Sequence, residues 1–594
     1  MNPRTRVHLV IGIIVGLLGV VIARGFTSTR ADVPPEPFYD NVSLEPFEDV
    51  AVFHRGRLKP FPSFAAEAVG FVSGMGKVRG HTDGFTYLDM MFRPETYAQS
   101  DVVYVPKKPF RGQIANRIRE RMPAVVANDS FFINRPELDA AGREAWINER
   151  LDRFVKRGRI AAELLNEEGV RALLGVLSRD VIKTAKHVER VQAALATKDP
   201  QNLALRFAIV PPPGGDDKTP WISPEALFRG GSEAVIQRSP ESAMAITSVR
   251  NDWQTLTRAW RAQDVQVVNE TIVSLAATLP TLNPEVYPDR DRLALESWYT
   301  SSGGMTWVWL FYLAAVAVLL GAVAYQWASA RWVGMGLFAL ALALHTTKIG
   351  LRWYVSGRWP NSNMFEAVTT AAWFGCIVAL LLEYWGRKTP LKNVFALTAA
   401  VASMFALMTA NFSPKLDSSI NNMMPILHDA WLYIHTNVII ASYALIAMAS
   451  VTGLIYLLYR LGGGKRDYAR LGGAAALIET TGGTLADARH KPTLGEVMDG
   501  ATMILMELAV IMLWAGIIMG AVWADHSWGR PWGWDPKEVF ALNTLIIFLV
   551  LVHIRLKVVD KGLWTAWLAV IGCGVMLFNW IIINFVISGL HSYA

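Results

Sequence analysis

Cysteine is almost absent from this sequence. Its 594 residues include only Cys376 and Cys573, and both lie inside apolar runs. Neither belongs to a CxxC pair, so the sequence excludes a dithiol redox motif, a disulfide framework and a cysteine-based zinc site.

Charged residues are also scarce, at 18% of the chain, whereas hydrophobic residues make up 52%. This balance excludes both a wholly soluble protein and one that lies entirely in a membrane, so we expect one part of each kind. The formal net charge is +7, but the basic residues gather in short loops between apolar runs. No basic helix is interleaved with base-stacking aromatic residues, so we expect membrane topology rather than nucleic-acid binding to account for the charge.

Long apolar runs are missing from residues 25–300, where proline-rich pieces alternate with stretches of helical periodicity such as 140–197. An apolar run over residues 7–23 precedes this region and follows two arginines. The run could be a signal peptide, but its length and the lack of a small-residue cleavage site favour an uncleaved anchor over residues 1–24. The basic start predicts a cytoplasmic N-terminus, so residues 25–300 are expected to form a mostly helical extracytoplasmic domain.

The rest of the chain, residues 301–594, is dominated by apolar runs close to the twenty or so residues that a helix needs to cross a bilayer. These runs cover residues 305–327, 332–352, 364–386, 391–410, 433–459, 502–524, 538–557 and 563–588. Alternating them from an exported residue 300 leaves four inner loops, three of which carry basic clusters, as the positive-inside rule requires. We therefore predict an all-α polytopic membrane protein of about nine transmembrane helices, with the extracytoplasmic domain between helices 1 and 2. This topology places residues 411–432, residues 523–538 and the C-terminus on the outer face.

A dense aromatic cluster, WGRPWGWDPKE, occupies residues 528–538 between two of these runs. Its two glycines and two prolines exclude a continuous helix, so a loop at the membrane surface is expected. The indoles of Trp528, Trp532 and Trp534 offer flat faces for a planar ligand, or they belong to the aromatic belt at the lipid headgroups. The density of the cluster and the charges of Asp535 and Lys537 favour a ligand platform.

Two histidines flank this loop in sequence and are predicted on the same face, His435 at the start of its span and His591 beyond the last span. We expect the two imidazoles to line an outer-face ligand site beside the indoles. The alternative is that each is an interfacial histidine bonded to water or headgroups.

The tryptophan cluster, preceded by AVWA at residues 521–524, resembles the WWD signature of haem-handling proteins of cytochrome c biogenesis, and its WDPKE ending resembles the CcsA branch. Residues 425–444 and 589–593 resemble the family segments that hold the two external histidines. Residues 352–366 resemble the family's RWxxSGxxPxSNxYES loop, for which we consider both capping of the next helix through Ser362 or Asn363 and direct ligand contact. The resemblance covers about residues 330–594 and leaves the soluble domain unmatched.

The resemblance implies that His435 and His591 ligate the iron of haem b beside a WWD loop at 523–538. The expected haem-binding residues of this loop are Trp528, Gly529, Trp532, Trp534, Asp535 and Lys537, and the tryptophans and Asp535 are also expected to be catalytic. Cations such as Lys537 and Arg530 are natural partners of the haem propionates.

His553 lies about fifteen residues below the outer end of its span, where a titratable side chain is costly and indicates function. Residues 552–555 resemble the family's LHxR segment, whose histidine is assigned to a second haem site within the membrane. The alternative is a neutral histidine bonded across helices. In the family the partner ligand comes from a ResB-like subunit or fused half, which this chain does not show; His8 or a histidine of another protein could serve.

The function implied is delivery of haem to an outer-face site in the bacterial inner membrane, and its attachment there to the CxxCH segment of apocytochrome c. The expected partners are haem, apocytochrome c, a ResB-like membrane subunit and membrane lipid, with no nucleic acid. The chain itself has no CxxCH, so haem is not attached to it covalently. The rival readings are a bis-histidine cytochrome b that takes electrons from quinol, and a transporter or scaffold whose loop binds lipid or a partner.

Overall fold

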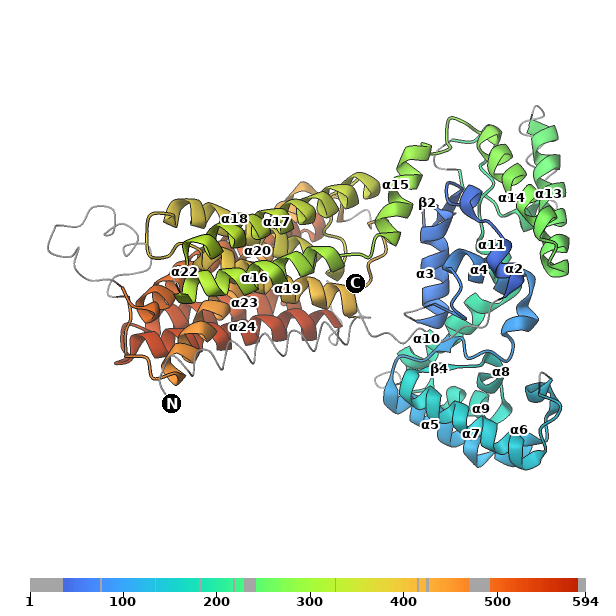
Figure 1. The fold of residues 1–594 in the computed structure, drawn as a ribbon, viewed down its shortest axis with the longest axis horizontal. Helices are drawn as coiled ribbons and strands as arrows, with labels where there is room; N and C mark the ends of the chain where they lie inside the picture. The colour runs from blue at the N-terminus through green and yellow to red at the C-terminus, as the bar shows by residue number, and fades with distance from the viewer. Residues whose placement is uncertain are drawn as a thin grey trace. The chain divides into compact units, whose positions relative to one another are not determined.

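The computed structural model describes residues 36–74, 77–133, 135–180, 184–216, 219–228, 242–325, 327–413, 416–423, 427–469 and 492–585. These residues fall into two compact units that divide between Ser301 and Ser302 (Figure 1). We call residues 36–301 the soluble unit and residues 302–585 the membrane unit. The expected anchor over residues 1–24, with His8, and the C-terminal His591 lie outside the described residues.

The soluble unit is mostly helical, and its two small sheets each contain two antiparallel strands. The strands are β1 (Ala51–His54) with β2 (Arg57–Pro60), and β3 (Val103–Tyr104) with β4 (Arg159–Ile160). The α-helices are α2 (Pro37–Asn41), α3 (Phe61–Ser73), α4 (Asp83–Phe92), α5 (Lys108–Glu120), α6 (Met122–Val126), α7 (Ala140–Arg157), α8 (Ala162–Leu165), α9 (Glu168–Leu177), α10 (Ala185–Lys198), α11 (Pro200–Arg206), α13 (Ala243–Ala262), α14 (Val265–Thr278) and α15 (Arg290–Ser301). Short 3₁₀ helices are η1 (Glu45–Phe47), η2 (Pro94–Tyr97), η3 (Asp129–Phe132), η4 (Pro224–Phe228) and η6 (Leu279–Leu282).

Buried ion pairs hold the β1–β2 hairpin to its neighbours. Arg57 on β2 pairs with Glu296 on α15, with Nη1 2.9 Å from Oε1. Lys59 is fully buried and donates to both carboxylate oxygens of Glu67 at 2.6 and 2.7 Å. Burial lowers the pKa of the Lys59 ammonium, and the Glu67 carboxylate opposes that shift. The hairpin therefore joins α3 to α15, the last helix before the membrane unit.

Within the described residues, the membrane unit contains eight helices long and apolar enough to cross a bilayer. They are α16 (Thr306–Tyr325), α17 (Ala328–Ser356), α18 (Met364–Gly386), α19 (Val394–Phe412), α20 (Ala430–Leu461), α22 (Leu494–Trp528), α23 (Pro536–Ile554) and α24 (Lys561–Phe585). This confirms the predicted all-α polytopic membrane protein and all eight spans expected after residue 301.

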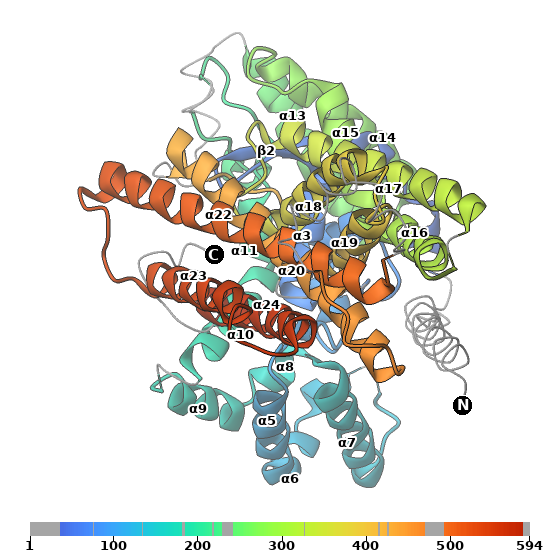
Figure 2. The ribbon, with the colours of Figure 1, turned by 90° about the vertical axis from the view of Figure 1, so that its left-hand side faces the viewer.

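Helix α20 is central to the packing of the membrane unit and contacts α18, α19, α22 and α24 (Figure 2). Small residues permit this close packing. A Cβ on Gly453 of α20 would lie 2.9 Å from the Ala566 carbonyl of α24, and one on Gly375 of α18 would lie 3.1 Å from Ala444 of α20. Helices in a membrane gain affinity mainly from such contacts, because lipid is as apolar as their side chains.

The segment between α22 and α23 is shorter than the loop expected over residues 523–538. Helix α22 continues to Trp528, and Gly529 then stops it in the left-handed conformation, with φ 67°. Helix α23 begins at Pro536, which is tolerated at a first helical position because that N–H has no partner in the helix. Only residues 529–535, here called the tryptophan loop, are non-helical. We call the end of the membrane unit at this loop the tryptophan end.

Candidate functional site

Two carboxylates fix the end of the tryptophan loop. Asp535 is the N-cap of α23, is 4% exposed and accepts a hydrogen bond from the Lys537 amide at 3.1 Å. Glu538 completes a capping box, since its Oε2 accepts from the Asp535 amide at 3.2 Å. The same oxygen also accepts from the Gly533 amide at 2.8 Å. Asp535 therefore acts in the structure as a backbone cap.

Trp534 lies between those two bonded amides and is held with φ 56°. A left-handed backbone costs an L-residue other than glycine roughly 1–2 kcal/mol, so the bonds to Glu538 offset strain in this turn. The Trp534 side chain is 73% exposed, and its ring stands perpendicular to that of Trp532, with the centroids 6.0 Å apart. The loop thus presents the Trp534 ring outward, with the partly buried Trp532 beside it.

The Trp528 side chain packs against the body of the membrane unit. Its ring packs against the buried Trp523 with the centroids 5.0 Å apart. Both rings belong to a small apolar cluster with Met423, Leu427 and Leu432. The last turn of α22 is therefore anchored on the segment that precedes α20, and this contact sets the base from which the tryptophan loop projects.

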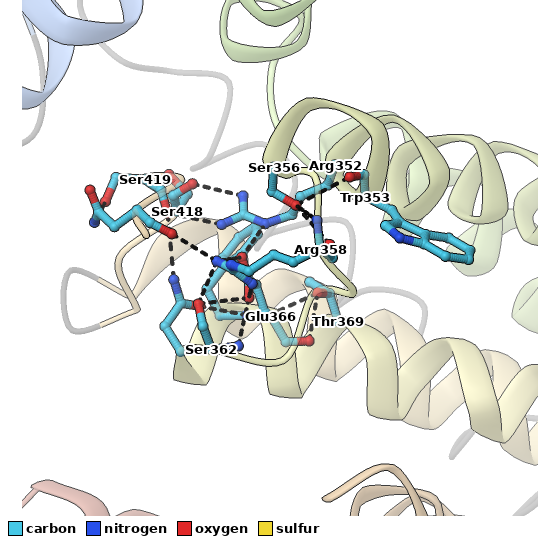
Figure 3. Close-up of polar contacts among 12 residues, drawn as sticks. Arg352, Trp353, Ser356, Arg358, Ser362, Glu366, Thr369, Ser418 and Ser419 are labelled. Atoms are coloured by element: carbon cyan, nitrogen blue, oxygen red, sulfur yellow. Dashed lines mark hydrogen bonds and ion pairs between the residues drawn. The ribbon is translucent and has the colours of Figure 1, made fainter. Parts of the chain in front are cut away.

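A buried ionic network lies at the same end of the unit (Figure 3). Glu366 at the start of α18 is fully buried and receives two arginines, with Arg352 Nε 2.8 Å from Oε1 and Arg358 Nη1 2.9 Å from Oε2. The Ser362 amide adds a bond of 2.7 Å to Oε2, and the Asn363 side chain caps α18 through the Glu366 amide at 2.9 Å. Of the two roles weighed for residues 352–366, the structure shows the capping role, through Asn363.

The two arginines also hold the segment that leads to α20. Arg352 donates to the Ser418 and Ser419 carbonyls at 2.8 and 2.9 Å, and Arg358 donates to the Asn421 carbonyl at 3.0 Å. This segment continues to Met423 of the apolar cluster under Trp528. The network therefore braces the surface on which the end of α22 rests.

His435 lies one turn into α20 and packs against α22. Its Nδ1 is 2.7 Å from the Gly516 carbonyl oxygen, and a Cβ on Gly520 would lie 2.5 Å from the imidazole ring. A carbonyl can only accept, so Nδ1 carries the proton and Nε2 is the basic nitrogen of the neutral ring. Metal-binding histidines are usually oriented in this way. Beside it, Trp359 Nε1 donates to Asn437 at 3.0 Å, which ties the braced loop to the same turn of α20.

Comparison with known proteins places this arrangement in a family. A family model described as cytochrome C assembly protein matches residues 361–591. The cytochrome c biogenesis protein CcsA of Parasynechococcus marenigrum is 33% identical over 270 residues, which cover 43% of this chain and 85% of that protein. The chain belongs to the CcsA family. The CcsA proteins of Guillardia theta and Gloeobacter violaceus are both 29% identical, over 299 and 320 residues that cover 96% and 94% of those proteins.

As a CcsA-family member, the chain is a multi-pass membrane protein of cytochrome c biogenesis. The family model begins inside the membrane unit and extends past its last described residue, and it includes the ionic network from Ser362 onward, His435 and the whole tryptophan loop. The soluble unit lies outside that match.

The structure brings several of the expected site residues of this CcsA-family chain together at the tryptophan end. Asp535 and Lys537 bond to each other, and Arg530 lies over Gly533, where a Cβ would be 3.4 Å from the guanidinium. Trp534 is exposed with the partly buried Trp532 beside it, whereas Trp528 packs against the apolar cluster that contains Trp523. Gly529 serves as the cap of α22.

His553 lies apart from these residues, in the last turn of α23, and its side chain is exposed. Its Nδ1 is 2.7 Å from the Leu549 carbonyl oxygen, so Nε2 is again the basic nitrogen. Two residues later, Arg555 forms a buried two-point ion pair with Asp499 of α22 at 2.5 and 2.6 Å, and also donates to the Ala469 carbonyl at 3.0 Å. The two residues of the LHxR-like segment thus differ, since His553 faces outward and Arg555 fixes the helix end.

Sequence reasoning missed the residues that support the site. In the sequence, Arg352, Arg358 and Glu366 are only parts of a resembling loop, and Glu538 is only the last residue of the WDPKE ending. The signal was present, because a charged residue inside or at the edge of an apolar span must find a partner. Nothing in the sequence indicated a role for Gly520. Only the packing of α20 on α22 shows that the His435 ring occupies the space that a Cβ at position 520 would fill.

Proposed function

We propose that this CcsA-family protein receives haem at the tryptophan end and presents it there for attachment to apocytochrome c. The observation that carries the proposal is the Trp532–Trp534 pair on a fixed loop, with Trp534 exposed, at the same end as His435 with its Nε2 as the basic nitrogen. An indole pair suits the flat apolar macrocycle, an imidazole suits its iron, and Arg530 and Lys537 suit its propionates.

In this proposal haem b is the substrate. His435 and His591 are the two axial ligands, Trp528, Trp532 and Trp534 flank the porphyrin, and Asp535 and Gly529 keep the loop in shape. The tryptophan end faces the extracytoplasmic side of the bacterial inner membrane, as does the domain expected over residues 25–300. The residues of the protein supply orientation and axial ligation.

Attachment forms a thioether bond at each of the two vinyl groups. Each thiol of the CxxCH segment adds across one vinyl double bond, so that sulfur bonds to one carbon and the thiol proton is transferred to the other. The addition itself moves no net electrons, and the protein's part is to hold the vinyl edge of haem toward the arriving thiols.

A second haem site at His553 is the further part of the proposal. An exposed imidazole on α23 with Nε2 as its basic nitrogen suits an axial ligand whose partner is supplied by His8 or by another protein, such as a ResB-like subunit. A side chain of this kind in lipid is otherwise costly.

The absorption spectrum of the purified protein tests the axial ligand. The wild type should carry bis-histidine haem b, and His435→Ala should lose most of that signal at the tryptophan end. The matched control is His428→Ala, because His428 is an exposed histidine seven residues earlier at the same end. A wild-type protein purified without haem would favour the alternative function as a transporter or scaffold. A full haem spectrum in His435→Ala would show that His435 is not an axial ligand.

Holocytochrome c formation in a host that lacks its own system tests the loop. Trp532→Ala should reduce the yield at least tenfold, because it removes the ring that stands against Trp534. A normal yield with normal expression of the variant would show that the loop takes no part in attachment.

A further inference from the structure

Glu538 makes one bond more than its place in a capping box requires. In the ordinary box the third helical residue accepts from the amide of the N-cap residue, as Glu538 does from Asp535 at 3.2 Å. Its Oε2 also accepts from Gly533 at 2.8 Å, and Gly533 lies two residues before the cap. One carboxylate oxygen therefore bonds the amides on both sides of Trp534.

The opposite end of the membrane unit contains a second capping box for comparison. Thr493 is the N-cap of α22, and Glu496 Oε2 accepts from its amide at 2.9 Å while Thr493 Oγ1 accepts from the Glu496 amide at 3.2 Å. The two boxes have the same chemistry and the same position relative to their helices. Only the one at Asp535 has an exposed tryptophan in a left-handed conformation directly before its cap.

The two amide bonds determine where the indole points. With the Gly533 and Asp535 amides both held to one oxygen atom, the Trp532–Gly533 and Trp534–Asp535 peptide units have fixed directions, and Trp534 between them keeps φ at 56°. A left-handed residue projects its Cβ to a different side of the chain from an extended one, so the loss of these bonds would let the indole swing away. The perpendicular arrangement with Trp532 depends on that direction.

We propose that Glu538 is the positioning residue of the tryptophan loop: its carboxylate holds Trp534 in the left-handed turn that directs the indole toward the haem. The identity of the ligand as haem rests on the proposed function, whereas the positioning of Trp534 rests only on the geometry of the loop. Glu538 itself faces the backbone and contacts no reacting atom.

Fluorine NMR of the full-length protein in lipid nanodiscs, stripped of haem and with 5-fluorotryptophan incorporated, reports the surroundings of Trp534 independently of haem binding. Trp534→Phe identifies the resonance. Glu538→Ala should move it toward the position of free 5-fluorotryptophan, and Glu538→Asp should do the same, because the shorter side chain withdraws the carboxylate from the Gly533 amide. Glu538→Gln keeps an acceptor oxygen at the same reach and should leave the resonance near the wild-type position. Glu496→Ala, the matched control, should leave it unchanged.

Holocytochrome c yield in the same variants distinguishes the positioning role of Glu538 from the function proposed for the tryptophan loop. Both hold if Glu538→Ala and Glu538→Asp lose at least tenfold in yield while Glu538→Gln and Glu496→Ala stay within about twofold of wild type. A shifted resonance with normal yield supports the positioning and overturns the function proposed for the loop. An unchanged Trp534 resonance in Glu538→Asp overturns the positioning, whatever the yield. The aspartate variant keeps the charge and remains informative if the alanine variant does not fold.

Discussion

The tryptophan end and the opposite end of the membrane unit use the same two stabilising devices. At the tryptophan end a buried carboxylate, Glu366, receives Arg352 and Arg358, and at the opposite end a buried carboxylate, Asp499, receives Arg555. Each arginine also holds main-chain carbonyls of a neighbouring segment. Each end also contains a helix that begins with a capping box.

The two ends differ in where backbone strain is placed. Asn393, at the opposite end, has φ 68°, but asparagine tolerates this region and the residue is buried as the N-cap of α19. Trp534 has φ 56° and is largely exposed. Strain on a bulky exposed residue has no benefit for packing, and such strain tends to occur at functional sites. The comparison therefore agrees with the binding role proposed for the tryptophan end.

The largest expected effect comes from removing the buried carboxylate at either end. Glu366→Ala leaves two buried arginines without their counter-charge, and Asp499→Ala leaves one, so each should destabilise the protein by about 3–5 kcal/mol. Unfolding by SDS titration in mixed micelles measures the change. Hydrogen exchange then sharpens the comparison, since residues 416–423 should lose protection in Glu366→Ala, whereas residues near Ala469 should lose it in Asp499→Ala. Equal protection of residues 416–423 in both variants would show that the network does not brace the tryptophan end.

An intermediate effect is expected from Gly520→Ala. Its new Cβ would lie 2.5 Å from the His435 ring, so the imidazole must leave its bond to Gly516 or α20 must shift. Overpacking of this kind costs about 1–3 kcal/mol, and on the proposed function the haem spectrum should weaken. The control is Gly500→Ala near the other end of α22, where the new Cβ would make an ordinary contact at 3.6 Å with Ala469. If both variants kept the wild-type spectrum, the packing of His435 on α22 would be irrelevant to haem binding.

The smallest effect is expected from the two N-caps. Asp535→Ala and Thr493→Ala each remove a side chain that caps a helix, and each should cost about 1 kcal/mol. The unfolding midpoints should therefore shift by similar amounts. Holocytochrome c yield should fall only in Asp535→Ala, because only that cap is adjacent to the tryptophan loop. A similar fall in Thr493→Ala would mean that yield simply follows stability.

The sequence was sufficient to predict the eight spans after residue 301, since apolar runs of that length have few alternatives to a membrane helix. It also pointed to the tryptophan loop, because glycine and proline punctuate it so strongly. The ends of the helices were less predictable. Helix α22 begins at Leu494, eight residues before the expected span, because its first turns pack inside the unit and need no continuous apolar run.

The inner organisation of the site could not be read from the sequence. Glu366 and Ser418 are far apart along the chain, and only the packing of the spans brings both of them to Arg352. The inward turn of Trp528 depends on an apolar cluster built from a segment more than ninety residues earlier. The positive φ of Trp534 runs against the preference of its residue type, so local propensity would have predicted the opposite.

The length of α22 has a consequence for how a partner reaches the loop. A helix of 35 residues is about 52 Å long, some 20 Å more than the hydrocarbon layer is thick. Tilting absorbs part of the excess, and the remainder raises the helix ends into the headgroup layer. Trp528 is the last residue of this helix, and Trp534 stands beyond it. On the proposed function, an unfolded apocytochrome c approaching from the water would therefore meet these rings at headgroup level, and would not have to enter the lipid tails to deliver its thiols.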